Sequence, residues 1–159
     1  MKNFKNKVVV ITGAASGMGR SYALMFAKLG SKIAICDYDE KGLRETEKMV
    51  MELADVPVYA EKLDVSDKAG VYAFAQAVKA ELGNAHVIIN NAGVSGEGRP
   101  VWALSDDSYE RVMGINFWGV VHGTRAFLPQ LLANGEGAVV NVSSIFGLVG
   151  TPSNSDYCA

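Results

Sequence analysis

The chain has 159 residues, and its 15 Lys and Arg side chains nearly balance 17 Asp and Glu, giving a formal net charge of −2. This balance excludes the strongly basic surface expected of a nucleic-acid-binding protein. No apolar run reaches the ~20 residues that crossing a bilayer requires. The first hydrophobic run is short and β-branched, unlike a signal peptide. We therefore expect a single cytoplasmic domain over residues 1–159, with neither nucleic acid nor membrane as a partner.

The first predicted strand, 7–12, leads directly into a glycine-rich turn, and a predicted helix follows at 17–29. Gly13, Gly17 and Gly19 give this turn the spacing Gly-x-x-x-Gly-x-Gly. Glycines let a backbone turn sharply and approach a bound diphosphate, whose charge the amino end of the next helix favours. The spacing departs from the Gly-x-Gly-x-x-Gly fingerprint of dinucleotide-binding folds. An ordinary strand-to-helix turn is therefore an open alternative.

A carboxylate stands at the end of the second predicted strand, where residues 32–36 give way to Asp37. At that place a carboxylate accepts hydrogen bonds from the ribose hydroxyls of an adenosine and repels a 2′-phosphate. Asp37 therefore favours NAD over NADP. The alternative is a capping aspartate ahead of the predicted helix at 40–53, a role that Asp39 fills equally well.

Predicted strands and helices alternate along the whole chain. Their order is strand 7–12, helix 17–29, strand 32–36, helix 40–53, strand 57–61, helix 67–82, strand 86–90, helix 106–132 and strand 137–143. The strands are almost continuously apolar, as expected of strands that are buried on two faces. Alternation with short connections predicts an α/β fold, in which a doubly wound, Rossmann-like parallel sheet lies between two layers of helices.

Further short motifs follow the fourth and fifth predicted strands. They are Asn90-Asn91-Ala92-Gly93, Ser143-Ser144 and a tyrosine, Tyr157, thirteen positions after Ser144. Together with the glycine turn, they resemble the classical short-chain dehydrogenase/reductase family in order and spacing. Four independent motifs rarely coincide by chance. The resemblance implies an oxidoreductase that uses NAD, or less readily NADP, to interconvert a secondary alcohol and a ketone.

The resemblance also implies roles for individual residues. Tyr157 matches the tyrosine of Tyr-x-x-x-Lys that moves the proton of the reacting oxygen, Ser144 matches the serine that holds this oxygen, and Asn116 completes the catalytic set. The positions that match cofactor-binding residues are Gly13, Ser16, Gly17, Met18, Gly19, Asp37, Asp64, Val65, Asn90, Ala92 and Gly93. These roles suit hydride transfer, because the alkoxide that develops needs a proton and a hydrogen-bond donor.

Each catalytic candidate has a plainer interpretation when it is taken alone. Asn116 lies on the apolar stripe of a predicted helix, where it can satisfy a buried carbonyl. Ser144 can be a turn serine, and Tyr157 can be a packing aromatic. The spacing between Ser144 and Tyr157 favours the catalytic interpretation of both.

The motif lysine would fall at position 161, beyond Ala159. We therefore expect a C-terminally incomplete domain that lacks the family's last strands, which leaves the strand around 139–142 as an apolar edge. The resemblance implies a homo-oligomer for a complete protein. The alternative function is a catalytically incompetent dinucleotide-binding fragment or interaction module.

Cysteines and histidines add little to this prediction. Two cysteines make no disulfide framework, and neither Cys36 nor Cys158 has the spacing of a metal ligand, so we expect no metal site. Cys36 is expected to pack inside its strand. His86 and His122 are assigned to the surface or to an interface.

Overall fold

The computed structural model describes residues 3–159 and shows an open parallel sheet between helices. The strands are β1 (Val8–Thr12), β2 (Lys32–Asp37), β3 (Val58–Lys62), β4 (Ala85–Asn90) and β5 (Ala138–Asn141), and they lie in the order β3-β2-β1-β4-β5. All four strand pairs are parallel. The predicted doubly wound α/β fold is therefore confirmed.

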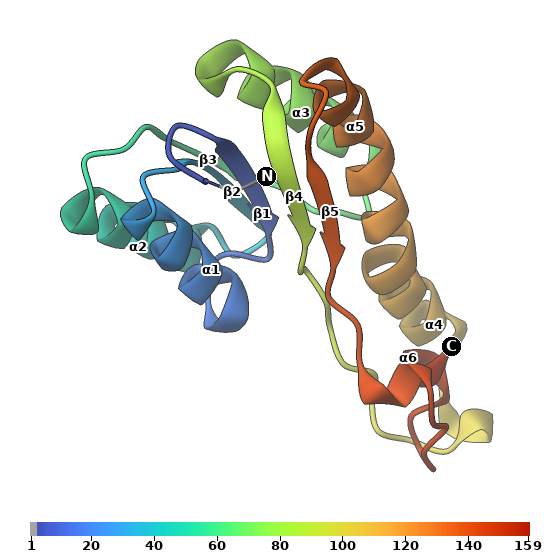
Figure 1. Cartoon of the computed structure of the whole chain (residues 1–159). Helices are drawn as coiled ribbons and strands as arrows, with labels where there is room; N and C mark the ends of the chain where they lie inside the picture. Colours follow the sequence, from blue (N-terminus) through green and yellow to red (C-terminus); the bar gives the residue numbers. More distant parts are fainter. Residues whose placement is uncertain (1–2) are drawn as a thin grey trace.

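Helices connect the strands and cover both faces of the sheet (Figure 1). They are α1 (Gly17–Lys28), α2 (Glu40–Leu53), α3 (Lys68–Leu82), α4 (Asp106–Met113), α5 (Gly119–Ala133) and α6 (Ser155–Cys158). The short helical turns are η1 (Val101–Ala103), η2 (Gly114–Trp118) and η3 (Ile145–Gly147). No helix within residues 3–159 is both long enough and apolar enough to cross a membrane.

The core forms two layers because side chains alternate along each strand. Val9 and Ile11 of β1 pack with Phe26 of α1 and Leu43 of α2 on one face. On the other face, residues such as Val10 pack with the helices α3 and α5. Every residue of β1 is buried, which explains why its sequence is apolar throughout rather than alternating.

The long helix predicted at 106–132 is present as three consecutive segments, α4, η2 and α5. The middle segment, Gly114–Trp118, is a π-helical turn that contains Asn116. Such single wide turns are frequent at functional sites. A Cβ on Gly119, just after this turn, would lie 2.7 Å from a methyl carbon of Val65. Gly119 therefore allows the start of α5 to pack closely against Val65.

Sheet order reverses at β1, which has β2 and then β3 on one side and β4 and then β5 on the other. In open α/β sheets, ligands bind in the crevice at the carboxyl ends of the strands where such a reversal occurs. The turns after β1 and β4 meet at this edge, so the fold brings the glycine turn and the Asn90–Gly93 segment together.

Candidate active site

The glycine turn between β1 and α1 needs its glycines for different reasons. Gly13 and Gly17 have positive φ angles of 68° and 52°, a conformation that glycine adopts without strain. A Cβ on Gly19 would lie 2.1 Å from the carbonyl oxygen of Gly13, whereas one on Gly17 would meet nothing within 4 Å. Gly17 therefore faces open space, and Gly19 lets the first turn of α1 pack against the loop.

The amino end of α1 has free backbone amides. Ser16 occupies the N-cap position, but its side chain makes no capping hydrogen bond. Uncapped amides at the start of a helix, together with the helix dipole, favour an anionic group. The turn therefore has the geometry of a phosphate-binding loop.

Two sets of hydrogen bonds fix the end of β1 and the glycine turn to the segment after β4. The Asn91 side chain after β4 donates to the carbonyl oxygens of Thr12 (2.9 Å) and Gly13 (3.1 Å). In return, the Thr12 hydroxyl accepts from the backbone amides of Asn91 and Ala92, each at 3.0 Å. The ends of β1 and β4 are thus joined side by side.

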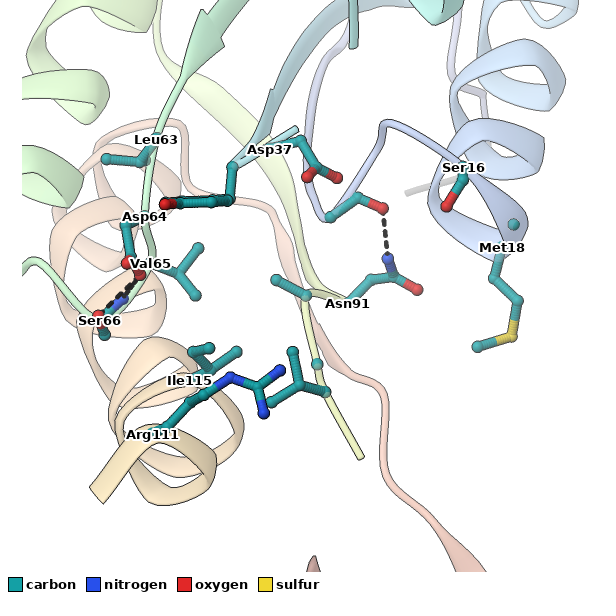
Figure 2. A pocket seen from close by; sticks show the side chains of 16 residues that line it. Ser16, Met18, Asp37, Leu63, Asp64, Val65, Ser66, Asn91, Arg111 and Ile115 are labelled. Atoms are coloured by element: carbon teal, nitrogen blue, oxygen red, sulfur yellow. Dashed lines mark hydrogen bonds between the residues drawn. The ribbon is translucent and has the colours of Figure 1, made fainter. Parts of the chain in front are cut away.

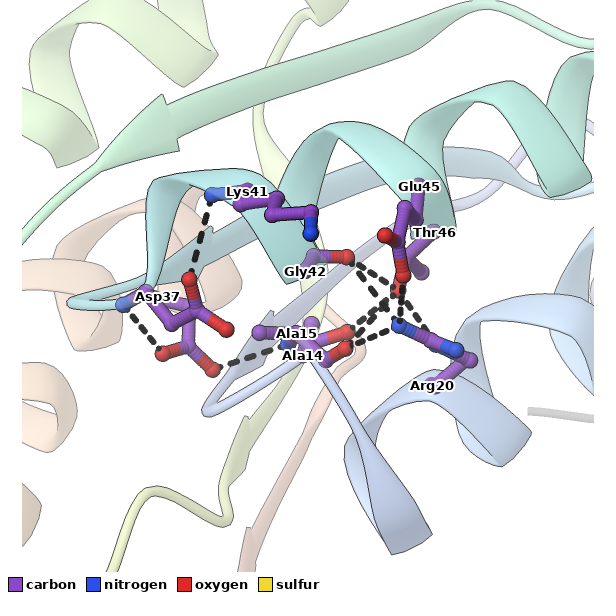
Figure 3. A network of polar contacts seen from close by, with 9 residues as sticks. Ala14, Ala15, Arg20, Asp37, Lys41, Gly42, Glu45 and Thr46 are labelled. Carbon is purple, nitrogen blue, oxygen red and sulfur yellow. Dashed lines mark hydrogen bonds and ion pairs between the residues drawn. The ribbon is translucent and has the colours of Figure 1, made fainter.

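Arg20 connects the same turn to α2 by hydrogen bonds (Figure 3). Its guanidinium donates to the carbonyl oxygen of Ala15, to that of Gly42 at 3.2 Å and to the Thr46 hydroxyl at 2.8 Å. Thr46 is completely buried and donates to Ala14 at 2.8 Å. The sequence analysis assigned no role to Arg20 or Thr46, because 26 residues separate them in the chain.

The structure shows which of the two aspartates caps α2. Asp39 caps α2, since its side chain accepts from the backbone amide of Lys41 at 3.1 Å. Asp37 instead accepts from Ala15 at 2.8 Å and from the amide of Asp39 at 2.9 Å. Its half-buried carboxylate lies beside the glycine turn and faces a cleft, as Figure 2 shows.

The cleft that Asp37 faces is the larger of two neighbouring clefts and has a volume of about 770 Å³. Its walls are the glycine turn, the end of β2, segment 63–66, segment 91–94, and Arg111 and Ile115 of the long helix (Figure 2). Nine predicted cofactor-binding residues line it: Gly13, Ser16, Gly17, Met18, Asp37, Asp64, Val65, Ala92 and Gly93. The lining therefore combines apolar side chains and carboxylates with the glycine turn.

Two further predicted cofactor-binding residues, Gly19 and Asn90, line neither this cleft nor its neighbour. Asn90 is buried, and its amide group donates to Thr124 at 3.1 Å and to Asn141 at 2.8 Å. A Cβ on Gly123 would lie 2.2 Å from the Asn90 side-chain oxygen. The contacts of Asn90 are thus with α5 and β5, behind the cleft.

A smaller cleft of about 380 Å³ shares Met18 and residues 91–94 with the larger one. Asn116, Ser144 and Tyr157, the three predicted catalytic residues, all line it. They come from η2, from the segment after β5 and from α6, respectively. The fold therefore gathers three polar side chains that are distant in sequence beside the glycine turn.

Asn116 holds the backbone of Val94 on both sides. Its side-chain oxygen accepts from the Val94 amide, and its nitrogen donates to the Val94 carbonyl, each at 2.9 Å. This pairing agrees with the plainer interpretation of Asn116, while its place in the wall of the smaller cleft agrees with the other. Both functions are compatible, because fixing Val94 shapes the cleft.

Ser144 and Tyr157 have hydroxyl groups available for a ligand. The Ser144 oxygen accepts from the amide of Phe146 at 3.2 Å, which leaves its own proton free to be donated. The Tyr157 ring packs edge-on against Phe146, with 6.2 Å between centroids. Within residues 3–159, the Tyr157 hydroxyl has no hydrogen-bond partner. Hydroxyls that can still donate a hydrogen bond in a cleft are suited to holding a substrate oxygen.

His122 does not lie at the surface, so the surface alternative for this residue was wrong. It is 9% exposed, and its Nδ1 lies 3.2 Å from the Val65 carbonyl oxygen. The reason is that α5 packs its His122 face against the segment after β3. His86 is half-buried, and its ring accepts from the Val8 amide at 3.2 Å.

The fold and the clefts define an α/β domain of the Rossmann type. The family described as short chain dehydrogenase matches residues 7–159. This chain therefore belongs to the short-chain dehydrogenase/reductase family, as the sequence motifs predicted.

Curated relatives and solved structures agree with this family. The chain is 43% identical over 159 residues to the putative oxidoreductase SadH of Mycobacterium tuberculosis, covering 100% of this chain and 57% of SadH. It is 41% identical over 158 residues to human epidermal retinol dehydrogenase 2, covering 99% of this chain and 51% of that protein. The chain thus spans about half the length of the curated relatives it matches.

A solved structure of a family member from Burkholderia phymatum, in complex with NAD, superposes with a TM-score of 0.93. Its sequence is 40% identical, and the match covers 99% of this chain and 56% of the other. The architecture of this chain therefore matches that of a family member that was solved with bound NAD.

Proposed function

We propose that this protein is an NAD-dependent oxidoreductase that interconverts a secondary alcohol and a ketone. The observation that carries the proposal is the continuity of the two clefts, which places Ser144 and Tyr157 next to the glycine turn. In such an arrangement a dinucleotide spans both clefts, with its reactive end beside the two hydroxyls.

The larger cleft fits the adenosine and diphosphate groups of NAD. The free amides at the start of α1 bind the diphosphate, and Asp37 accepts from the ribose hydroxyls. The base lies between the apolar side chains of Val65 and Ile115. Asp64 is held in place by the Ser66 amide at 2.9 Å and hydroxyl at 2.7 Å.

NAD is favoured over NADP by the charges around Asp37. A 2′-phosphate would meet this carboxylate at short range. The nearby Arg20 guanidinium does not line the cleft, because it binds Ala15, Gly42 and Glu45 instead. Among the residues that line the larger cleft, the one basic side chain is Arg111, on the opposite wall from Asp37 (Figure 2).

The residues of the smaller cleft handle the proton and the substrate oxygen. Bound NAD supplies the group that accepts or donates a hydride. Ser144 donates a hydrogen bond to the substrate oxygen, and Tyr157 accepts its proton during oxidation or returns one during reduction. Asn116 keeps Val94 in place as a wall of the substrate site. The names of two relatives, a retinol dehydrogenase and a putative oxidoreductase, support this reaction class.

Calorimetric titration with NAD and NADP tests the cofactor part of the proposal. NAD is expected to bind at least about tenfold more tightly, and the substitution Asp37→Ala is expected to remove most of this preference. Asp39→Ala is the matched control, because it removes a neighbouring carboxylate that caps α2. Equal affinities for the two nucleotides would contradict the role of Asp37.

Turnover of a panel of secondary alcohols, followed as NADH formation, tests the catalytic part. Tyr157→Phe is expected to lower kcat by about 10²-fold or more and to leave the Kd for NAD unchanged. Tyr72→Phe on the outer part of α3 is the control. Tight NAD binding without turnover by the unchanged protein would support a dinucleotide-binding module instead.

A further inference from the structure

A completely buried carboxylate precedes Tyr157 in α6. Asp156 has no exposed surface, although aspartate is seldom fully buried unless it is paired. Its Oδ2 accepts from the Ser108 hydroxyl at 2.8 Å and from the Glu97 amide at 3.3 Å. Its Oδ1 accepts from the amide of Tyr157 at 2.9 Å. No cation pairs with it within residues 3–159, so these donors are what stabilises the charge.

The three donors belong to three different parts of the fold. Ser108 lies in α4, Glu97 lies in the segment between β4 and η1, and Tyr157 lies in α6. α6 packs beside α4, as Figure 1 shows. One carboxylate therefore connects the helix that carries Tyr157 to two elements that precede it by 48 and 59 residues.

The surrounding backbone is shaped to receive this carboxylate. A Cβ on Gly96 would lie 2.1 Å from the Asp156 Oδ1, which is far inside van der Waals contact. Any other side chain at position 96 would displace the carboxylate or the segment. The next pair along the two helices is also hydrogen-bonded, since the hydroxyls of Tyr109 and Ser155 lie 2.7 Å apart.

The segment that Asp156 holds is also held by Asn116. Asn116 binds the backbone of Val94, and Asp156 binds the backbone of Glu97, three residues later. Val94 and Tyr157 both line the smaller cleft. Two polar side chains thus fix the two ends of segment 94–97, of which Val94 and Ser95 line the cleft beside Tyr157.

Burial alone raises the pKa of the Asp156 carboxyl, but the hydrogen bonds from Ser108, Glu97 and Tyr157 outweigh it, and the pKa lies below its usual value. The group is therefore an anion at neutral pH, and an anion accepts hydrogen bonds more strongly than a neutral group does.

We propose that Asp156 is a positioning residue, whose buried carboxylate fixes the Tyr157 phenol relative to segment 94–97. This inference rests on the proposed role of Tyr157, but its test does not require turnover. It concerns the preorganisation of the acid–base group, which must be held close to its productive geometry.

The test compares Asp156→Asn with Tyr109→Phe. An asparagine has one amide oxygen for three donors, so at least one of the amides of Glu97 and Tyr157 faces an NH₂ group. Tyr109→Phe removes the neighbouring α4–α6 hydrogen bond and leaves the carboxylate intact. The two variants therefore loosen the same helix pair, and only one of them alters the contacts of Asp156.

The readout is the ¹⁹F resonance of 3-fluorotyrosine at position 157, assigned among the six tyrosines of the chain by its loss in Tyr157→Phe. We expect Asp156→Asn to shift and broaden this resonance, whereas Tyr109→Phe leaves its position unchanged. Thermal unfolding is measured for both variants. A purely structural role would lower the melting temperature of Asp156→Asn while the Tyr157 resonance stays unchanged, and this result would overturn the proposal.

Ser108→Ala keeps the test decisive if Asp156→Asn does not fold, because it removes one donor and keeps the anion. We expect a smaller shift of the same resonance, and no shift would count against the proposal.

NAD affinity, measured in parallel, is expected to stay within about twofold in every variant, because Asp156 lines neither cleft. Where the protein turns over an alcohol, Asp156→Asn is expected to lower kcat about tenfold or more with KM unchanged. Absence of NAD binding in the unchanged protein would refute the proposed function, and it would leave the result on Tyr157 standing.

Discussion

Two strands with mainly apolar sequences, β1 and β5, have opposite environments. β1 has neighbours on both sides, and all five of its residues are buried. β5 pairs with β4 alone, and Val139 and Val140 are 38% and 44% exposed. β1 supports the larger cleft, whereas β5 leads to Ser144 and the smaller one. The proposed nucleotide half of the site therefore stands on a buried strand, and the proposed catalytic half stands on the edge strand of the described sheet.

This difference shows that apolar composition alone does not define a core strand. The sequence analysis predicted an apolar edge around residues 139–142, and the strand order within residues 3–159 confirms it. An exposed edge presents unpaired amides and carbonyls that can pair with another chain. Because β1 is buried and β5 is partly exposed, substitutions around β1 are expected to destabilise the protein much more than substitutions in β5.

A methyl group added at the glycine turn should have the largest effect. The Cβ of Gly19→Ala would lie 2.1 Å from the carbonyl oxygen of Gly13, so we expect a loss of about 3 kcal/mol in the free energy of unfolding. Gly150→Ala is the matched control, since a Cβ there meets nothing within 4 Å. Urea denaturation measures both. Similar losses for the two variants would refute the contrast in packing.

A hydroxyl group placed on each strand should give the next largest difference. Val10→Thr in β1 buries a hydroxyl among apolar side chains and should lower the free energy of unfolding by about 2 kcal/mol. Val140→Thr in β5 should change it by less than about 0.5 kcal/mol, because the residue is exposed. Urea denaturation again provides the values. A cost for Val140→Thr as large as that for Val10→Thr would show that β5 is covered in solution.

Removal of the arginine behind the glycine turn should weaken nucleotide binding. Arg20→Ala breaks the contacts with Ala15, Gly42 and Thr46, and we expect the Kd for NAD to rise about tenfold, or about 1.4 kcal/mol. Arg44→Ala on α2 is the control, because Arg44 pairs with Glu47 and is more exposed. Calorimetry compares the two Kd values. An unchanged affinity in Arg20→Ala would show that the turn holds its shape without this residue.

The reactivity of the two cysteines should show the same difference between the buried part of the sheet and the region after β5, without a large change in stability. Burial, followed by the negative charges of Asp37 and Glu61, raises the pKa of the Cys36 thiol far above its usual value, so the reactive thiolate is scarce. Cys158 is only half-buried. A thiol-specific chromogenic reagent should modify Cys158 alone in the native protein and both cysteines after denaturation. Rapid reaction of Cys36 in the native state would show that β2 opens readily.

The sequence predicted the element order well because each strand and helix has a strong local signal. The limits of α2 were predicted without error, and β4 begins one residue earlier than predicted. The π-helical turn inside the long helix was not predicted, since it depends on how the helix packs. The glycine spacing and the thirteen residues from Ser144 to Tyr157 indicated the candidate site and the family.

By itself, the sequence determined the fold class, the family and the identity of the candidate site residues, because strand periodicity and motif spacing are local properties of a chain. Only the tertiary structure decided which aspartate caps α2, which groups Arg20 binds and where Asp156 lies. The physical reason is that each of these side chains has partners brought close by the packing of the sheet and its helices. The partners of Asp156 lie up to 59 residues away in sequence, and no local pattern encodes such a contact.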